Sequence, residues 1–581
     1  MKKIKFLIIL MIAILILNCK GAKIDIKNLQ RGDTIVTAMQ SMPNSLNFLI
    51  DYNSTSILIG SFLYETLLTR DSETLELKPL LAKKWIISPD KLTYTFILDE
   101  DAKWENGSPV TSEDVIFTYN TIMNENNLTG LFRTGYEDEF ESVTALDEKT
   151  VVFKAKKKRW SVFHSAYGFV VLPKYQFEGK DFNKDFNLNL PAGSGPYRIK
   201  EVVPDRYILL ERRDDYWGYK LDYQKNYYKF KEIKYKVISD NEIMFEALKK
   251  GDIDLMGGGS AAQWYRRTVS EKSKHIEKNW IIPKRIWNYH PIGFQAFYMN
   301  LRRDKFKDKR VRVALAKLLN FKLLNEKIMY NQYEKLYSQF PSYFNNNPEL
   351  PRIEYDPEGA RELLKEAGWA KVDSEGFLIN EKGERFEISF TYTDQSLEKH
   401  LTVYKDDCQR VGIKFNLDLI SPSSFRKKVF IDFDYDMTWV AWGTSMFPSI
   451  EDVWRGKFAN EKNTNNIGGY SNPEVDKLLD MYLEEFDEVK RKEIMKKIDL
   501  IIANDVPVIL LWTAPYIRIF YWNKFNIPEK YIRKYGDDDD IYLLWGIDKD
   551  KEKNLIDAVV KDISLPSENI EFYYDEALIQ K

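Results

Sequence analysis

The stretch from Gly293 to Phe321 constrains the fold most, because it runs from a strand through a charged turn directly into a helix. On one face of this strand the alternation places Phe294, Ala296, Tyr298 and Asn300. Asp308 is positioned to cap the helix, in which apolar residues recur at helical spacing from Val311 to Leu319. Such a passage suits a chain that leaves one lobe and enters another. We therefore expect two lobes with a ligand between them.

The N-terminus carries the pattern of an export signal. A positively charged start precedes an apolar run over residues 6–17, which is too short to span a bilayer. Cys19 follows this run closely, and the arrangement resembles a bacterial lipobox, although the two residues before the cysteine are larger than usual there. The alternative is an ordinary signal peptide with an incidental cysteine. We expect a signal peptide over residues 1–18, lipid on Cys19 and a tether over residues 19–32.

Composition argues against several functional classes. The net charge of −2 disfavours a nucleic-acid partner. After the signal only Cys408 remains, so an internal disulfide is impossible and a packed thiol is expected. The four histidines are not spaced as metal ligands, and there is no Walker loop or His-Glu-x-x-His motif. We expect a monomer with no catalytic residue, metal or cofactor, although a surface glycosidase with two acting carboxylates stays open as an alternative.

A glycine-rich run after a predicted strand needs a separate interpretation. Residues 257–262 fit a loose Gly-x-Gly-x-x-Ala pattern, which in a βαβ unit would indicate a dinucleotide site. Neither a βαβ unit nor an acidic residue for the ribose accompanies it. We expect instead that this backbone passes close to another group, with Trp264 just beyond. The acidic run over residues 537–540 lacks the spaced ligands of a calcium loop, so a solvated loop is expected there.

The segment from Leu80 to Met123 combines a hairpin with a capped helix. Two alternating strands flank a Pro-Asp turn, and Thr111 with Asp114 forms a capping box. This segment, together with residues 192–200 and 207–218, resembles family 5 of the extracellular solute-binding proteins, the oligopeptide, dipeptide and nickel receptors of ABC importers.

A second set of motifs narrows the resemblance. Residues 300–315 and 320–325, with residues 245–251 and 260–264, look like the YejA-like branch, which is associated with import of peptides and of the peptide antibiotic microcin C. The resemblance implies an α/β, type II periplasmic-binding-protein fold, in which two lobes (three domains) surround a ligand cleft and a two-strand hinge joins them. The implied ranges are 33–70 with 191–298 and 515–581 for the main domain of the first lobe, 71–190 for its inserted subdomain, and 299–514 for the second lobe.

The implied function is capture of oligopeptides, or peptide-like compounds, and delivery to the permease subunits of an ABC importer. The implied location is the periplasm or the cell surface, with a lipid anchor. The same fold could instead take an oligosaccharide, haem or nickel as its cargo, and nickel fits least because histidine is scarce.

The resemblance also implies where the ligand binds. In relatives, the segment equivalent to residues 440–445 lies along the cleft, and an aspartate after a Trp-x-x pattern often holds the amine of the peptide. This chain has no carboxylate there, and the first acids that follow are Glu451 and Asp452. We expect the ligand-binding residues to be Trp442, Gly443, Thr444, Ser445, Tyr64, Glu65, Trp264, Tyr298 and Asn300. A buried ammonium needs a counter-charge, so we expect Glu65 or Glu451 to reach it, or a ligand with a blocked N-terminus.

Overall fold

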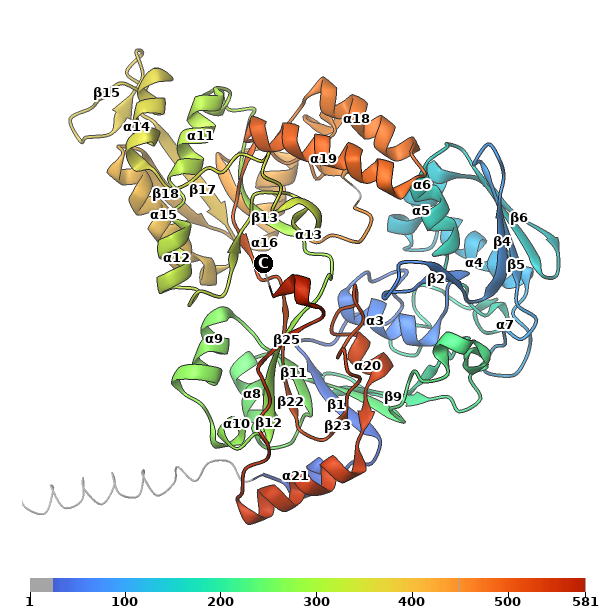
Figure 1. Cartoon of the computed structure of the whole chain (residues 1–581). Helices are drawn as coiled ribbons and strands as arrows, with labels where there is room; N and C mark the ends of the chain where they lie inside the picture. Colours follow the sequence, from blue (N-terminus) through green and yellow to red (C-terminus); the bar gives the residue numbers. More distant parts are fainter. Residues whose placement is uncertain (1–23, 449, 580–581) are drawn as a thin grey trace, which may run out of the picture. The chain divides into compact units, whose positions relative to one another are not determined.

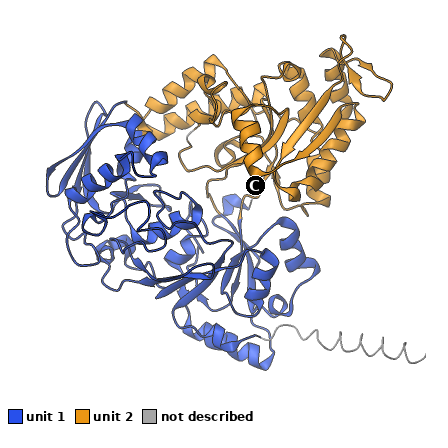
Figure 2. Cartoon of the chain, turned by 180° about the vertical axis from the view of Figure 1, so that it is seen from behind, with its two compact units in different colours: residues 1–157, 162–287, 517–581 blue, residues 158–161, 288–516 orange. Residues whose placement is uncertain are grey.

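The computed structural model describes residues 24–448 and 450–579, so the predicted signal peptide and Cys19 lie outside the described residues. The chain forms two compact units, coloured separately in Figure 2. Unit 1 comprises residues 1–157, 162–287 and 517–581, and unit 2 comprises residues 158–161 and 288–516. Within the described part of the chain, no helix combines the length and the apolar character needed to cross a membrane.

Unit 1 contains two four-stranded sheets in its main part (Figure 1). The first has the order β1-β10-β9-β8, where β1 (Thr34–Met39) runs parallel to β10 (Glu232–Val237), followed by β9 (Tyr207–Arg212) and β8 (Tyr197–Val203). The second has the order β11-β22-β12-β25, formed by Leu255–Gly257, Ile517–Trp522, Ile281–Trp287 and Glu571–Tyr573. Helices α8 (Asn241–Lys249) and α21 (Lys549–Lys561) share a buried apolar cluster with the second sheet.

A third sheet of unit 1 lies in the region expected to be the inserted subdomain. It has the order β4-β5-β7-β6, formed by Ala82–Ile87, Thr93–Leu98, Thr150–Ala155 and Phe140–Asp147. Strands β4 and β5 form the predicted hairpin. Helix α4 (Ser112–Met123) begins at the predicted capping box, because the Asp114 carboxylate accepts a hydrogen bond from the backbone N–H of Thr111.

A buried ion pair joins distant segments of unit 1. The Lys524 ammonium lies 2.8 Å from a carboxylate oxygen of Asp254, and both side chains are inaccessible to solvent. Asp254 also accepts hydrogen bonds from the Arg31 guanidinium at 3.1 Å and from the backbone N–H of Val36 at 2.8 Å. Lys524 donates to the carbonyl of Leu29 at 3.2 Å. The first described segment is thereby fixed to the sheets of unit 1.

Unit 2 is built on one five-stranded sheet with the order β18-β17-β19-β13-β20. These strands are Lys414–Leu419, Glu387–Tyr392, Met437–Trp442, Phe294–Met299 and Val508–Leu510. Helices α18 (Pro473–Glu484) and α19 (Glu488–Asp505) pack on the face that carries Tyr298. On the opposite face Phe297 meets Tyr404 of helix α15 (Glu398–Arg410), and α11 (Lys309–Lys317) begins at the predicted Asp308 cap.

The unit boundaries differ from the expected ones in three places. Residues 294–298, expected in the first lobe, form β13 of unit 2 because their backbone pairs with β19 and β20, so the boundary lies at 287/288. Residues 158–161, expected in the inserted subdomain, belong to unit 2 because the indole of Trp160 is buried against Tyr482, with ring centroids 5.6 Å apart. The return to unit 1 lies at 516/517 instead of 514/515.

Candidate functional site

The carboxyl end of β19 is the exposed part of the predicted site. Strand pairing with β13 ends where Trp442 faces Phe294. Beyond it Gly443, Thr444 and Ser445 are exposed, and among the described residues no strand pairs with them. A strand end with unpaired backbone groups can add an extended peptide through main-chain hydrogen bonds. These exposed residues belong to unit 2, and their role in ligand binding stays a prediction.

Close contacts hold the exposed segment in place. A Cβ atom added to Gly293 would lie 1.9 Å from the carbonyl oxygen of Trp442, so only glycine lets the two backbones approach so closely. The Ser445 hydroxyl donates to the carbonyl of Phe447 at 2.9 Å, and the Tyr343 hydroxyl donates to the carbonyl of Met446. The indole of Trp442 is half-buried and donates to the Tyr298 hydroxyl at 2.7 Å. The segment is therefore preorganised, while its backbone stays accessible.

Tyr298 and Asn300, both expected to face a ligand, are part of the core of unit 2. Tyr298 is 1% exposed, its hydroxyl accepts the Trp442 indole N–H, and its ring stacks on Trp454. Asn300 is fully buried, and its amide donates to the carbonyls of Phe433 and Tyr435 at 2.9 Å each. Buried polar groups need hydrogen-bond partners within the protein. The hydrogen bonds of Tyr298 and Asn300 therefore hold the neighbouring segments in position.

Of the two acids that follow the segment, Glu451 is already paired. Its carboxylate lies 2.7 Å from the Arg455 guanidinium and 3.4 Å from that of Arg159, and Lys457 lies 3.9 Å away. Three cations around one carboxylate leave it little capacity to neutralise a further cation. Glu451 therefore does not meet the expectation of an acid available to a ligand amine.

Asp452, the next residue, is less fully paired than Glu451 among the described residues. One carboxylate oxygen accepts from the Asn465 amide at 2.6 Å, whereas the other is buried and has no hydrogen-bond partner among residues 24–448 and 450–579. Burial raises the pKa of Asp452, and the Asn465 amide partly opposes that rise. Burial is the main cause of the raised pKa of Tyr298, and the charge of Asp452 adds a smaller contribution to it. Sequence reasoning noted Asp452 but preferred Glu451, because no local signal decides which of two adjacent helical acids faces inward.

The three predicted site residues of unit 1 are also buried. Tyr64 is 2% exposed and its hydroxyl donates to the carbonyl of Pro191 at 2.5 Å. Trp264 is 1% exposed and lies against Phe520, with ring centroids 4.8 Å apart. Glu65 is 5% exposed, and its two oxygens accept from the Tyr216 hydroxyl and, at 2.8 Å, from the Trp217 indole. All these partners belong to unit 1. The expectation that Glu65 reaches a ligand amine is therefore not met.

Burial of Glu65 has a measurable consequence for stability. It raises the pKa of this carboxyl from 4.5 to about 7, although the hydrogen bonds from Tyr216 and Trp217 act in the opposite direction. Because the folded state holds the proton more tightly, stability is retained below pH 4.5 and falls as the pH rises towards 7, by up to about 3 kcal/mol. Between pH 5 and pH 8, wild type should lose more unfolding free energy than Glu65→Gln, as measured by urea denaturation. Glu178→Gln, a change at an exposed carboxylate, is the control and should lose as much unfolding free energy over this pH range as wild type. Equal losses in wild type and Glu65→Gln would contradict the raised pKa.

Metal and cofactor binding find little support among the described residues. The one group of three or more potential metal ligands consists of Asp537, Asp538 and Asp539, whose oxygens lie within 4.8 Å of one another and which are mostly exposed. Three consecutive carboxylates on a loop lack the spaced ligands of a calcium site.

The predicted close approach at residues 257–262 is a contact within the protein, because a Cβ on Gly258 would lie 2.4 Å from the Cβ of Arg518.

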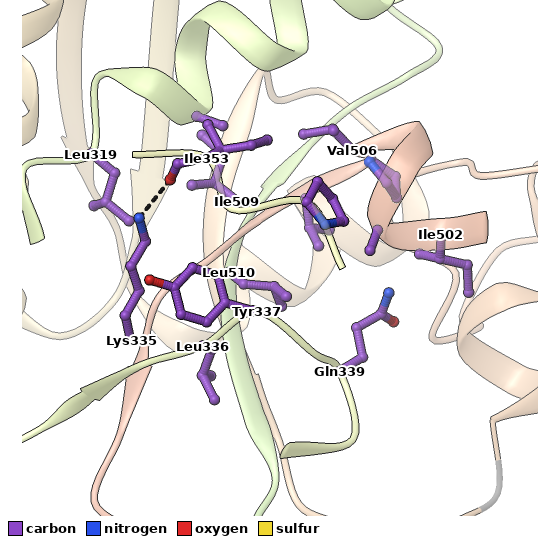
Figure 3. Close-up of a pocket in the computed structure, with 15 residues that line it drawn as sticks. Leu319, Lys335, Leu336, Tyr337, Gln339, Ile353, Ile502, Val506, Ile509 and Leu510 are labelled. Atoms are coloured by element: carbon purple, nitrogen blue, oxygen red, sulfur yellow. Dashed lines mark hydrogen bonds between the residues drawn. The ribbon is translucent and has the colours of Figure 1, made fainter. Parts of the chain in front are cut away.

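A small cavity in unit 2 lies beside β20 (Figure 3). Its volume is about 50 Å³, and it is lined by apolar side chains that include Leu319, Ile502 and Ile509. The Lys335 ammonium donates to the carbonyl of Ile353 at 2.5 Å, as the dashed line in Figure 3 shows. Ligand pockets usually have volumes of roughly 300–1,000 Å³, so this cavity is too small for a peptide.

Comparison with known proteins places these features in a family. The family model described as "Bacterial extracellular solute-binding proteins, family 5 Middle" matches residues 76–464. The probable peptide-binding protein YejA of Agrobacterium fabrum is 26% identical, over 82% of this chain and 83% of that protein.

Two solved structures share the fold. The oligopeptide-binding protein AppA of Bacillus subtilis, in complex with a nonapeptide, aligns with a TM-score of 0.68 at 23% identity, covering 89% of this chain and 99% of that one. NikZ of Campylobacter jejuni, in complex with Ni(L-His), aligns with a TM-score of 0.70 at 21% identity, covering 88% and 99%. The fold is thus that of the type II periplasmic binding proteins, as expected from the sequence.

Proposed function

The chain belongs to family 5 of the bacterial extracellular solute-binding proteins, in its YejA-like branch, and from this premise we propose that it captures oligopeptides or peptide-like compounds and delivers them to the permease of an ABC importer. The family consists of substrate-binding components of transport systems, not of enzymes. Two crossings, at 287/288 and 516/517, connect the main parts of the two units, and we propose that they act as hinges.

The exposed end of β19 is the observation that carries this proposal. Gly443, Thr444 and Ser445 offer backbone donors and acceptors at the end of a strand, and their side chains are small. A receptor for many peptide sequences needs such main-chain hydrogen bonds, because every peptide has the same backbone. Trp442, half-buried beside this segment, supplies an aromatic surface for a cargo side chain.

We further propose that Asp452 neutralises the N-terminal amine of the peptide. A free ammonium taken out of water is costly unless a carboxylate or several acceptors receive it. Asp452 has one oxygen without a partner in the described part of the chain, whereas the oxygens of Glu65 and Glu451 are engaged. Asp452 is half-buried and belongs to the same unit as Trp442 and the exposed end of β19.

Native mass spectrometry of the purified protein tests the cargo class. A receptor that buries its cargo releases it slowly, so the protein should carry a ladder of peptide masses that disappears after unfolding and refolding. A single sugar mass or a haem adduct would identify the alternative cargo, and a nickel adduct would do so despite the scarcity of histidine. A protein that hydrolyses added oligosaccharides or peptides would contradict a transport role.

We propose that lipid on Cys19 anchors the protein to a membrane. One acyl chain holds a protein only marginally, with about 0.8 kcal/mol for each buried CH₂, whereas two or more chains hold it stably. Cys19→Ala should therefore move the protein from the membrane fraction to the soluble fraction, as followed by fractionation and immunoblotting. Cys408→Ala is the matched control, because this buried thiol is part of unit 2 and should not affect anchoring. Membrane-bound Cys19→Ala protein would show that another feature is the anchor.

A further inference from the structure

Helix α21 exposes apolar side chains at its carboxyl end. Its buried face carries Leu555 and Ala558, which join the apolar cluster of unit 1. Val560 on the opposite side is 68% exposed, and Ile563, just past the end of the helix, is 53% exposed. Figures 1 and 2 both show α21 on the outside of unit 1, away from the sheet of the inserted subdomain. Val560 and Ile563 are three residues apart in the chain, and apolar groups that gather on a surface can mark an interaction site.

Cationic side chains accompany the two apolar ones. Lys553 precedes Val560 by seven residues, so the two lie on the same face of the helix. Lys553 is exposed, and no carboxylate of the described residues lies within ion-pair distance of it. Lys561 is also exposed and has only a long contact of 3.8 Å with Asp557. An apolar pair flanked by lysines fits the interface of a membrane that contains anionic lipids.

The short stretch of chain between Cys19 and the first described residue also favours a membrane as the partner of this surface. Ile24, the first described residue, packs against the same apolar cluster as Val559 and Leu565. Asp25 is also held, because its backbone N–H donates to the carbonyl of Lys250 at 3.2 Å. Only four residues lie between Cys19 and Ile24, so the Cα atoms of these two residues are at most about 18 Å apart when the chain is fully extended. A lipid on Cys19 thus keeps the bilayer within a short distance of the carboxyl end of α21.

We propose that the carboxyl end of α21 rests on the bilayer that holds the lipid, with Val560 and Ile563 in the interfacial region and Lys553 towards the lipid phosphates. This inference depends on the proposed lipidation of Cys19. Contact with the membrane would limit rotation of unit 1 about its tether and would so restrict the orientations in which the receptor meets a permease.

Spin-label accessibility tests the proposal on the full lipidated protein in vesicles of phosphatidylethanolamine and phosphatidylglycerol. Cys408→Ser removes the free thiol, and Val560→Cys supplies a site for a nitroxide. Leu146→Cys is the matched control, because Leu146 is 70% exposed at the end of β6, also in unit 1. Collision with a water-soluble nickel reagent at position 560 should be about threefold or more lower for the lipidated protein on vesicles than for the Cys19→Ala chain in solution, in which no second thiol takes the label. At position 146 it should stay unchanged.

The outcomes separate this inference from the proposed lipidation. Equal collision rates at position 560 in solution and on vesicles, with the protein bound to the vesicles, would overturn the membrane contact but not the anchor. A label at position 560 that becomes shielded only when a permease is added would assign this face to a protein partner and would also overturn the proposal. A protein whose Cys19 thiol is free by mass spectrometry, and which does not bind vesicles, would instead contradict the lipidation itself.

Discussion

Replacing Asp452 by asparagine should remove the preference of this receptor for peptides with a free amine. In wild type the amine meets a carboxylate oxygen that is buried and has no partner in the described part of the chain. Hydrogen bonds to charged groups contribute roughly 1.5–3 kcal/mol, so a free peptide should bind about 10- to 100-fold more tightly than its N-formylated form. In Asp452→Asn the two forms should bind with similar affinity. Isothermal titration of one peptide in both forms, against both proteins, gives this ratio.

Glu451→Gln is the matched control for this prediction. It changes the neighbouring acid, whose carboxylate is already paired with Arg455 and Arg159. Any effect of Glu451→Gln on folding lowers the affinity for the free and the formylated peptide equally. The ratio of these two affinities should therefore stay close to that of wild type. If wild type binds the free and the formylated peptide equally well, Asp452 does not receive an amine. Tighter binding of the formylated peptide would instead show that the preferred cargo has a blocked N-terminus. A ratio that falls in Glu451→Gln but not in Asp452→Asn would assign the role to Glu451.

Breaking the buried pair between Asp254 and Lys524 should destabilise unit 1 strongly. In Asp254→Asn the Lys524 ammonium, which is 1% exposed, loses its only carboxylate within the described residues, and the Arg31 guanidinium loses the same partner. Removal of one member of a buried ion pair typically costs about 3–5 kcal/mol, because an uncompensated charge stays in the interior. The loss should be visible in guanidinium denaturation followed by circular dichroism and, since the pair fixes the backbone of Val36, in faster hydrogen exchange along β1.

Two comparisons test this assignment. The double variant Asp254→Asn with Lys524→Met removes both charges of the pair and keeps an acceptor for the N–H of Val36, so it should be more stable than Asp254→Asn alone despite carrying one more substitution. The pair between Lys154 and Glu141, with 52% and 54% exposed side chains, is the control, and Lys154→Met should leave the denaturation midpoint nearly unchanged. A small effect of Asp254→Asn would mean that water reaches the site and that the pair is not truly buried.

Features whose signals lie within a few residues of one another were predictable from the sequence. Thr111 and Asp114 form the predicted capping box, and Asp308 caps α11 through the N–H of Arg310. The hairpin of β4 and β5 and the strand β13 also appear as predicted. Hydrogen bonds of caps and tight turns connect near neighbours in the chain, so a sequence pattern is sufficient to specify them. The family could be recognised from the same local motifs.

The roles of the predicted site residues depended on contacts across long stretches of sequence. The alternating pattern placed Tyr298 on one face of its strand, but the Trp442 indole that makes this face part of the core comes from 144 residues further along the chain. Glu65 is a charged residue between Tyr64 and Thr66, and its partner Trp217 lies 152 residues away. Burial is the sum of such distant contacts, and it is burial that raises the pKa of a carboxyl.

By itself, the sequence determined the family, the α/β architecture and a strand that ends at a glycine turn near Gly443. Only the tertiary structure decided how the two acids after this strand are paired. Glu451 and Asp452 are adjacent and lie on the same short helix, α17 (Glu451–Trp454). They differ in their partners. Glu451 forms ion pairs with Arg455 and Arg159 of unit 2. Asp452 accepts a hydrogen bond from Asn465 and has one oxygen without a partner among the described residues. Helix geometry turns neighbouring side chains by about 100°, and the surroundings that each then meets are set by the packing of the whole unit.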